Sequence, residues 1–212
     1  MKHLGILLSG RGSNFLAIAA AIDRGQIENA EISVVISNRA EASGIAAARA
    51  RGLATNVIEA RGRKRAEQDA EIIACLQEHD VELVCLAGYI RLLSPEFIAA
   101  FPNAILNIHP SLLPAFPGLD AQAQALAYGV AISGCTVHFV DEQLDHGVIV
   151  LQRAIPVLQG DDEETLSARI LEQEHVAYPE AISRVLSGNY AIVDRRYVAR
   201  ASQNTTLIEE AK

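Results

Sequence analysis

An amide and an imidazole stand two positions apart, at Asn107 and His109, near the end of a short apolar run. The run 104–108 is typical of a buried strand, and Pro110 should end it because proline cannot donate to a sheet ladder. Residues two apart on a strand point to the same face, so a hydrogen-bond donor and a titratable ring project together. The rim of an open parallel sheet is where ligands bind, which makes this pair a candidate site.

Three prolines, Pro110, Pro114 and Pro117, follow within eight residues and stiffen the loop that leaves the strand. A stiff loop loses less entropy when it is held as the wall of a site. The alternative interpretation is an ordinary polar strand end followed by a turn, because a single histidine is more often structural than catalytic. The pair therefore needs partners elsewhere in the chain.

A second candidate is the sequence S-G-R-G-S-N at 9–14, between an expected strand and an expected helix. Glycines allow the backbone to approach an anion, and a helix N-terminus offers free N–H groups and a positive dipole end. The pattern predicts a phosphate site. Phe15 stands where a dinucleotide fingerprint needs a third glycine, and the Gly-Lys-Ser/Thr ending of a nucleoside-triphosphate loop is absent. Glycines that serve only packing are the alternative.

A third candidate is the acidic segment 141–147, D-E-Q-L-D-H-G. It is typical of an exposed hairpin turn, but one of its carboxylates could reach His109 and hold the ring in place. Sequence spacing does not test that contact. His138 alternates on an expected strand and is interpreted as a histidine at the edge of the core.

Apolar segments alternate with helical ones through the first half of the chain, which predicts a doubly wound, mostly parallel α/β sheet with right-handed crossovers. Residues 133–140 and 148–157 are joined by too short a segment for a helical crossover, so we expect an antiparallel pair. Pro179 should kink or split a last helix over 163–186. Beyond Gly188 we expect a strand-like stretch and a frayed tail. The other expected strands are 4–8, 31–37, 55–58, 83–87 and 104–108, and the other expected helices are 14–24, 41–51, 64–79, 95–101 and 121–128.

Composition argues against several classes of protein. A net charge of −8 speaks against a broad nucleic-acid surface, and the basic run 61–65 is either a solvated loop or a local anion site. No apolar run approaches the roughly 20 residues that span a bilayer, and the N-terminus lacks a signal-peptide layout. The three cysteines have no metal-ligand spacing. We expect a cytoplasmic protein without a metal site.

Four motifs resemble the phosphoribosylglycinamide formyltransferase family, the folate-dependent enzymes of purine biosynthesis. They are S-G-R-G-S-N at 9–14, L-A-G-Y-I-R-L-L at 86–93, L-N-I-H-P-S-L-L-P at 106–114 and V-H-F-V-D-E-Q-L-D-H-G at 137–147. The resemblance runs from residue 4 to about 186 in one order. The last two motifs are shared by formyltransferases of this fold, whereas the first indicates the member that uses glycinamide ribonucleotide.

In that family an amine of glycinamide ribonucleotide attacks the formyl carbon of 10-formyltetrahydrofolate and forms a tetrahedral oxyanion. The resemblance implies that Asn107 and a protonated His109 stabilise this charge. It implies that Asp145 stabilises the imidazolium and assists proton transfer to the folate nitrogen. The formyl donor would be a co-substrate, and no metal would take part.

The resemblance also implies two sets of binding residues. The ribonucleotide set has Gly12, Ser13 and Asn14 at the phosphate, Glu174 at the amine end, and Pro110 beside the substrate. The folate set is Arg65, Ile90, Arg91, Leu92, Leu93, Asn107, Val140 and Asp141, with 90–93 lining the pterin pocket and 140–147 wrapping it. A cis peptide at Leu113–Pro114 would set the turn of the proline loop.

Three residues depart from the family pattern around the ribonucleotide pocket. Ala115 replaces a frequent lysine, Asp120 a common histidine, and Leu171 a polar residue that can assist phosphate binding. They bear on substrate affinity more than on reaction type.

The resemblance implies one formyltransferase domain over 1–188, a C-terminal extension over 189–212, small-molecule substrates, and a monomer or homodimer. One alternative is another enzyme of this fold, such as a formyltetrahydrofolate hydrolase or a methionyl-tRNA formyltransferase. The tRNA enzyme would carry a further RNA-binding domain and a more basic surface. A more distant alternative is a nucleotide-binding module without catalysis.

Overall fold

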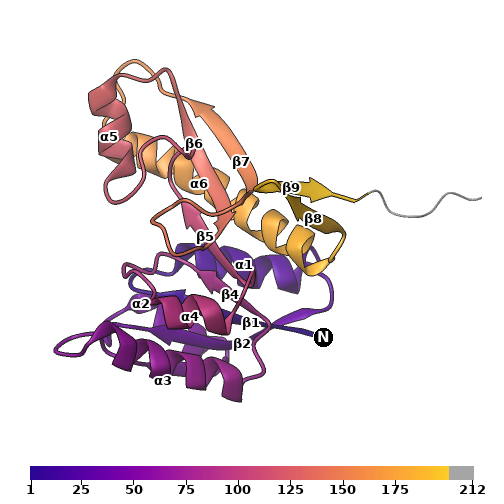
Figure 1. Ribbon diagram of the computed structural model, residues 1–212. Coiled ribbons are helices and arrows are strands. Elements are labelled where there is room, and N and C mark those ends of the chain that lie inside the picture. Colours follow the sequence, from indigo (N-terminus) through magenta and orange to yellow (C-terminus); the bar gives the residue numbers. More distant parts are fainter. Residues whose placement is uncertain (201–212) are drawn as a thin grey trace, which may run out of the picture.

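A seven-stranded sheet in the order β3-β2-β1-β4-β5-β6-β7 forms the centre of the computed structural model, which describes residues 1–200 (Figure 1). The first five strands in this order, β3, β2, β1, β4 and β5, run parallel. Strand β6 is antiparallel to both β5 and β7. The sheet strands are β1 (Lys2–Leu8), β2 (Ala30–Ser37), β3 (Thr55–Val57), β4 (Leu83–Leu86), β5 (Ile105–His109), β6 (Ile132–Phe139) and β7 (Ile149–Pro156). The predicted doubly wound sheet and its antiparallel pair are confirmed.

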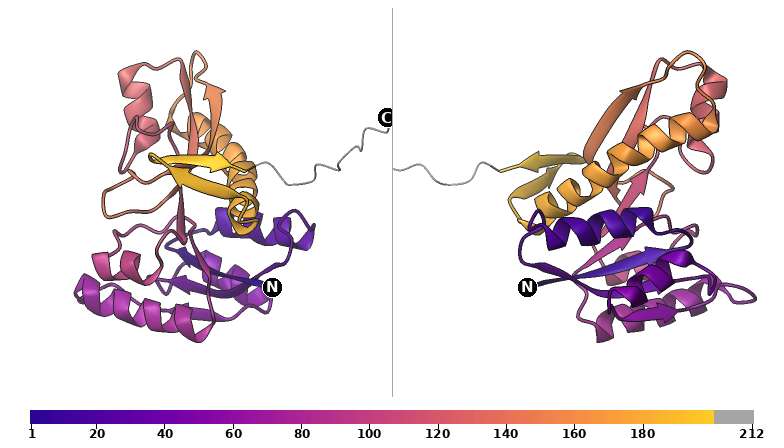
Figure 2. Two further views of the ribbon diagram at one scale, coloured as in Figure 1. Left: turned by 45° about the vertical axis from the view of Figure 1, so that its right-hand side comes forward. Right: turned by 180° about the vertical axis from the view of Figure 1, so that it is seen from behind.

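Helices cover both faces of this sheet, and each face has its own apolar core. The helices are α1 (Ser13–Asp23), α2 (Ser43–Ala50), α3 (Arg65–Glu78), α4 (Pro95–Ala100), α5 (Ala121–Tyr128) and α6 (Glu163–Leu186). One core joins the sheet to α1, α2 and α6, and the other joins it to α3 and α4. Figure 2 shows α6 running along the C-terminal half of the molecule to reach α1.

Strands covered on both faces need apolar residues at consecutive positions, and β1 has them: Leu4, Ile6, Leu7 and Leu8 are all fully buried. The carboxyl ends of the parallel strands β1, β4 and β5 therefore meet at one edge of the sheet. The loops that follow these strands contain the three candidate motifs at 9–14, 86–93 and 106–114. The fold thus brings together segments that are about 100 residues apart in the chain.

The end of the described chain was predicted in part. Helix α6 runs from Glu163 to Leu186 with Pro179 inside it, so of the two predicted effects of this proline, a kink or a split, the split is wrong. Packing accounts for its continuity, because Tyr178, Ala181 and Ile182 beside the proline are fully buried. After Gly188 the chain forms an antiparallel hairpin of β8 (Tyr190–Val193) and β9 (Arg196–Ala199). The predicted frayed tail falls on 201–212, outside the described residues.

Within residues 1–200, no helix combines the length and the apolar character needed to cross a bilayer. The division into a domain over 1–188 and an extension over 189–212 stays a prediction.

Candidate active site

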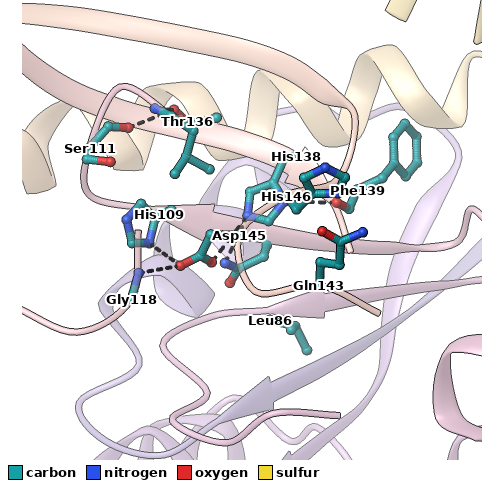
Figure 3. Close-up of polar contacts among 12 residues, drawn as sticks. Leu86, His109, Ser111, Gly118, Thr136, His138, Phe139, Gln143, Asp145 and His146 are labelled. Atoms are coloured by element: carbon teal, nitrogen blue, oxygen red, sulfur yellow. Dashed lines mark hydrogen bonds and ion pairs between the residues drawn. The ribbon is translucent and has the colours of Figure 1, made fainter. Parts of the chain in front are cut away.

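Asn107 and His109 lie at the carboxyl end of β5, where the sheet changes from parallel to antiparallel pairing. The register places His138 of β6 opposite Asn107, and Thr136 opposite His109. His109 is only 5% exposed, whereas Asn107 is partly open to solvent. Figure 3 shows the rings of His109 and His138 on either side of Asp145.

The loop between β6 and β7 brings Asp145 to His109, although 36 positions separate them in the chain (145 − 109). Asp145 Oδ2 lies 3.4 Å from His109 Nδ1, and it accepts a hydrogen bond of 2.7 Å from the Gly118 backbone N–H. The Asp145 side chain is 9% exposed. The carboxylate is therefore held between the proline loop and the end of β5 (Figure 3).

Both nitrogens of His109 face hydrogen-bond acceptors. Nε2 lies 2.8 Å from the Phe116 carbonyl oxygen, which can only accept, so Nε2 must carry a proton. Nδ1 faces the Asp145 carboxylate. The His109 ring therefore lies between two oxygen atoms, the Phe116 carbonyl on one side and the Asp145 carboxylate on the other.

His138 shows the opposite arrangement, and the sequence analysis gave it no functional part. Its Nδ1 donates to the Phe139 carbonyl at 2.8 Å, and its Nε2 lies 3.2 Å from Asn107 Nδ2. Burial lowers the pKa of His138, so the ring is neutral near pH 7 and its Nε2 accepts from Asn107. Asp145 Oδ1, at 3.8 Å from this Nε2, therefore faces a neutral ring.

This contact decides which way the Asn107 amide points. A neutral Nε2 accepts a hydrogen bond, so it selects the NH₂ group of Asn107 and leaves the amide oxygen on the other side. One N–H binds His138, and the second remains available to a ligand at the strand end. No sequence pattern indicated this partner, because it depends on the register between β5 and β6.

The proline loop is held by the hydroxyl of Thr136. This hydroxyl donates to the Ser111 carbonyl at 2.6 Å and accepts from the Leu113 N–H and from Gln152 Nε2, each at 3.0 Å. The predicted cis peptide at Leu113–Pro114 is present. The loop therefore has a defined path along one side of His109.

The 9–14 loop has the backbone geometry expected for an anion site. Gly12 precedes α1 with a φ of 74°, and a Cβ there would lie 2.9 Å from the Gly44 Cα, so only glycine fits. Ser9 joins this loop to the next one, because its hydroxyl accepts from the Ile90 N–H at 2.8 Å. Ser13, half-buried, is the first residue of α1.

Asn14 of α1 and Glu174 of α6 meet where the two helices pack together. Asn14 Nδ2 donates to Glu174 Oε2 at 2.7 Å, and both side chains are more than 90% buried. Burial raises the pKa of Glu174, and the hydrogen bond from Asn14 opposes this only in part. The Asn14 Oδ1 atom is buried and has no partner among the described residues. A buried carboxylate beside an unpaired amide oxygen offers acceptors to a hydroxylated or amine ligand.

The folate candidates lie on four separate segments, at 65, 90–93, 107 and 140–141. Ile90 and Leu92 are exposed, at 58% and 51% of their surface. The remaining candidates around them, Arg91, Leu93, Val140 and Asp141, are partly buried. Arg65 is exposed at the first position of α3, and no side-chain contact within residues 1–200 joins it to the others. Pro110 is partly buried directly after His109.

Comparisons with known proteins agree with this arrangement. A family model described as formyl transferase matches residues 2–182. The phosphoribosylglycinamide formyltransferase of Escherichia coli (strain K12) is 41% identical over 187 residues, which are 88% of this chain and 88% of that protein. A crystal structure of glycinamide ribonucleotide transformylase 1 from Symbiobacterium toebii matches with a TM-score of 0.92 and 48% identity, covering 95% of each chain.

Two further relatives differ in length or in distance. The trifunctional purine biosynthetic protein adenosine-3 of Drosophila pseudoobscura pseudoobscura is 47% identical over 189 residues, and these are 88% of this chain but 14% of that protein. The chain thus spans a small part of such relatives. A formyltetrahydrofolate deformylase from Pseudomonas syringae pv. tomato has a TM-score of 0.88 at 22% identity, which shows a shared fold alone.

Proposed function

The chain belongs to the formyl transferase family, and from that membership we propose that it transfers the formyl group of 10-formyltetrahydrofolate to the primary amine of 5′-phosphoribosylglycinamide. The observation that carries this proposal is the position of three side chains around the end of β5: the Asn107 amide, the His109 ring, and the Asp145 carboxylate beside that ring. A neutral amide and a cation side by side suit a developing negative charge.

In the proposed reaction the amine nitrogen forms a bond to the formyl carbon, and the carbonyl oxygen becomes an oxyanion. Asn107 and His109 would donate to this oxygen, where each donor contributes most in the transition state. Collapse breaks the bond between the formyl carbon and the folate nitrogen. The attacking amine loses one proton and the folate nitrogen gains one, so the products are the formylated amide and tetrahydrofolate.

His109 must change one partner to take part. Its Nε2–H donates to the Phe116 carbonyl in the free protein, and this donor would turn to the oxyanion when substrates bind. Nδ1–H would remain on Asp145, whose carboxylate stabilises the imidazolium. Asp145 is itself fixed by the Gly118 N–H, so it would hold the ring while the other nitrogen changes its acceptor.

The two substrates would occupy opposite sides of this centre. Gly12, Ser13 and Asn14 would bind the ribonucleotide phosphate, with Glu174 and Pro110 beside the rest of that molecule. The exposed apolar surface of Ile90 and Leu92 fits a pterin ring, and Arg65, Arg91, Leu93, Val140 and Asp141 complete the proposed folate side. Holding the reactants together supplies a large part of the rate. We further propose small-molecule substrates only and action in the cytoplasm.

Product analysis with the purified chain tests the proposal. The chain is mixed with 10-formyltetrahydrofolate, with and without glycinamide ribonucleotide, and tetrahydrofolate, formate and the formylated ribonucleotide are quantified. We expect tetrahydrofolate to form only with the amine and in equal amount to the formylated product. Formate release that does not depend on the amine would assign the chain to the hydrolases instead, and binding without turnover would assign it to non-catalytic modules.

A further inference from the structure

The C-terminal hairpin β8–β9 packs against the start of the loop that carries Asp145. Phe139, the last residue of β6, stacks on Tyr190 with ring centroids 6.1 Å apart, and Tyr190 stacks on Tyr197 at 4.8 Å. The Tyr197 hydroxyl donates to the Arg184 carbonyl of α6. Aromatic stacking and this hydrogen bond give the hairpin a fixed base beside β7 (Figure 1).

The turn of this hairpin reaches the other end of the same loop. Arg195 Nη2 donates to the His146 carbonyl oxygen at 2.6 Å, and its Nη1 lies 4.0 Å from Asp141 Oδ2. His146 follows Asp145 directly in the chain. One guanidinium therefore contacts the loop 140–147 near its beginning and on the residue after the proposed catalytic carboxylate.

The loop 140–147 has contacts of its own as well as contacts from outside. Within it, the Gln143 N–H donates to Asp141 Oδ1 and His146 Nδ1 lies beside Asp141 Oδ2, each at 2.9 Å. Asp145 has a φ of 49°, in the left-handed region that disfavours residues with a Cβ. Glu142, Gln143 and Leu144 just before it are exposed, so apolar packing does little to hold the segment. The end of the loop is tight at Gly147, where a Cβ would lie 1.7 Å from the Phe139 carbonyl oxygen. Between Asp145 and Gly147, the backbone carbonyl of His146 accepts a hydrogen bond from Arg195.

Arginine is an unfavourable choice for the turn that it occupies. Asp194 and Arg195, at the turn between β8 and β9, have φ values of 47° and 61°, the combination for which two-residue hairpin turns prefer asparagine and glycine. An arginine in this conformation costs backbone stability. Its side chain is 57% exposed, so its ion pair with Asp141 adds little stability. The hydrogen bond from Arg195 to the loop is therefore the remaining explanation for an arginine at this turn position.

We propose that Arg195 is a positioning residue that clamps the loop 140–147 and thereby holds Asp145 against His109. The proposal rests on the proposed formyl transfer for its effect on turnover. The clamp itself is a property of the free protein, so it can be measured without substrates. The contact between Arg195 and the loop also closes one side of a groove of about 760 Å³ between the hairpin and the loop. The wall of this groove includes Pro117, Leu144, Arg196 and Tyr197.

The test compares Arg195→Gly with the matched control Arg196→Ala. Both variants remove one positive charge from the same turn, but the Arg196 side chain makes no hydrogen bond or ion pair with any residue from 1 to 200. Glycine suits the positive φ at 195, so Arg195→Gly should fold with a Tm equal to or above that of the wild type. We expect its kcat to fall about tenfold, the scale of one lost hydrogen bond to a charged group, with an unchanged KM for the ribonucleotide.

Amide hydrogen exchange supplies a readout that needs no activity. The amides of residues 141–147 should exchange about tenfold faster in Arg195→Gly than in Arg196→Ala or the wild type. If Arg195→Gly keeps the kcat and the amide exchange rates of the wild type, the clamp is overturned. An equal loss of kcat in Arg196→Ala would overturn it as well. If the wild type transfers no formyl group, the proposed function fails, while the exchange rates still decide whether Arg195 holds the loop.

Discussion

Two histidines on neighbouring strands occupy opposite hydrogen-bonding surroundings in this site. Both nitrogens of His109 face acceptors, the Phe116 carbonyl and the Asp145 carboxylate. His138 donates through one nitrogen and accepts through the other, and burial lowers its pKa. The His109 ring thus lies between two acceptors, whereas the His138 ring is placed to orient an amide. This division of roles follows from the partners of each ring.

Removing the proposed oxyanion donors should reduce turnover and leave binding largely intact. We expect His109→Ala and Asn107→Ala each to lower kcat at least about a hundredfold, the usual effect of deleting one oxyanion donor. Steady-state kinetics measures this, with circular dichroism to verify folding. His79→Ala is the control, because that ring only contacts the Cys75 carbonyl at the end of α3. Wild-type kcat in folded Asn107→Ala would refute the assigned role.

His138 should affect catalysis only through Asn107. His138→Phe keeps an aromatic ring but removes the acceptor for Asn107 Nδ2, so the amide can rotate. We expect kcat to fall about tenfold, the effect of one lost hydrogen bond, with the KM for both substrates unchanged. His138→Gln, which offers an amide oxygen in place of Nε2, should retain more activity. Equal kcat values for the two variants would contradict an orienting role.

Glu174 should make stability depend on pH. Burial raises its pKa above 4.5. Its stabilising contribution is therefore fully present below pH 4.5 and is lost as the pH rises through the raised folded-state pKa, because the buried carboxylate must then ionise. Glu174→Gln stays neutral and keeps an acceptor for Asn14. We expect this variant to be the more stable one at pH 8, by about 1.4 kcal/mol for each unit of pKa difference, with the gap closing toward pH 4.5.

Urea unfolding at several pH values measures this gap. Glu172→Gln on the same helix is the control, because Glu172 is exposed. If the stability difference between Glu174→Gln and the wild type is absent at pH 8, or grows as the pH falls, then ionisation of Glu174 does not cost free energy in the folded protein. The variant should also bind the ribonucleotide more weakly if the carboxylate serves that substrate.

At the scale of elements, the proline loop depends on a strand hydroxyl outside the loop. Thr136 on β6 has all its hydrogen-bonding capacity used by Ser111, Leu113 and Gln152. The loop thereby keeps the Phe116 carbonyl and the Gly118 N–H close to His109 and Asp145. A hydroxyl on a β-strand thus anchors the loop beside the proposed catalytic residues.

Replacing this hydroxyl should be costly although the shape hardly changes. Thr136→Val leaves the buried Ser111 carbonyl and Leu113 N–H without this partner, whereas the Gln152 amide keeps its hydrogen bond to the Leu113 carbonyl. We expect a loss of about 2 kcal/mol in the free energy of unfolding, the cost of unsatisfied buried polar groups. Urea denaturation measures it, with Thr55→Val on the edge strand β3 as the control. A change below about 0.5 kcal/mol would show that water replaces the hydroxyl at no cost.

At the scale of the whole molecule, the ribonucleotide and folate sides belong to segments that share one sheet edge. Ser9 on the first loop binds the backbone of Ile90 on the second, and Tyr178 of α6 donates to the carbonyls of Leu86 on β4 and Leu106 on β5. Ligands bound at the proposed sites would therefore contact both halves of the fold. Binding should stabilise the molecule against global unfolding.

Glycinamide ribonucleotide at about 100 times its Kd should add about 2.7 kcal/mol of stability and raise the Tm by roughly 5 to 11 °C. Differential scanning fluorimetry measures this shift. Ribose 5-phosphate without the glycinamide group should give a smaller shift, because Glu174 would lack a ligand for the amine end. No shift with the ribonucleotide at any concentration would speak against the proposed substrate.

Much of the fold and the main chemical groups could be predicted from the sequence, because both depend on patterns among residues that are close together in the chain. Apolar runs, glycines at positive φ and a serine cap before Pro95 set the elements, and α5 begins and ends at the predicted residues. Asn107 and His109 share a face because alternation in a strand is a local rule. The motifs at 106–114 and 137–147 likewise pointed to Asn107, His109 and Asp145 as a set.

Only the tertiary structure decided which groups touch. The contact of Asp145 with His109, the part of His138, the anchoring by Thr136 and the reach of Arg195 each join residues from different elements. Such contacts depend on strand register and on loop path, which arise from packing of the whole sheet. Pro179 makes the same point, since the local rule predicts a broken helix and burial of its neighbours keeps α6 continuous. Local propensity is worth less than the apolar contacts that a packed helix makes.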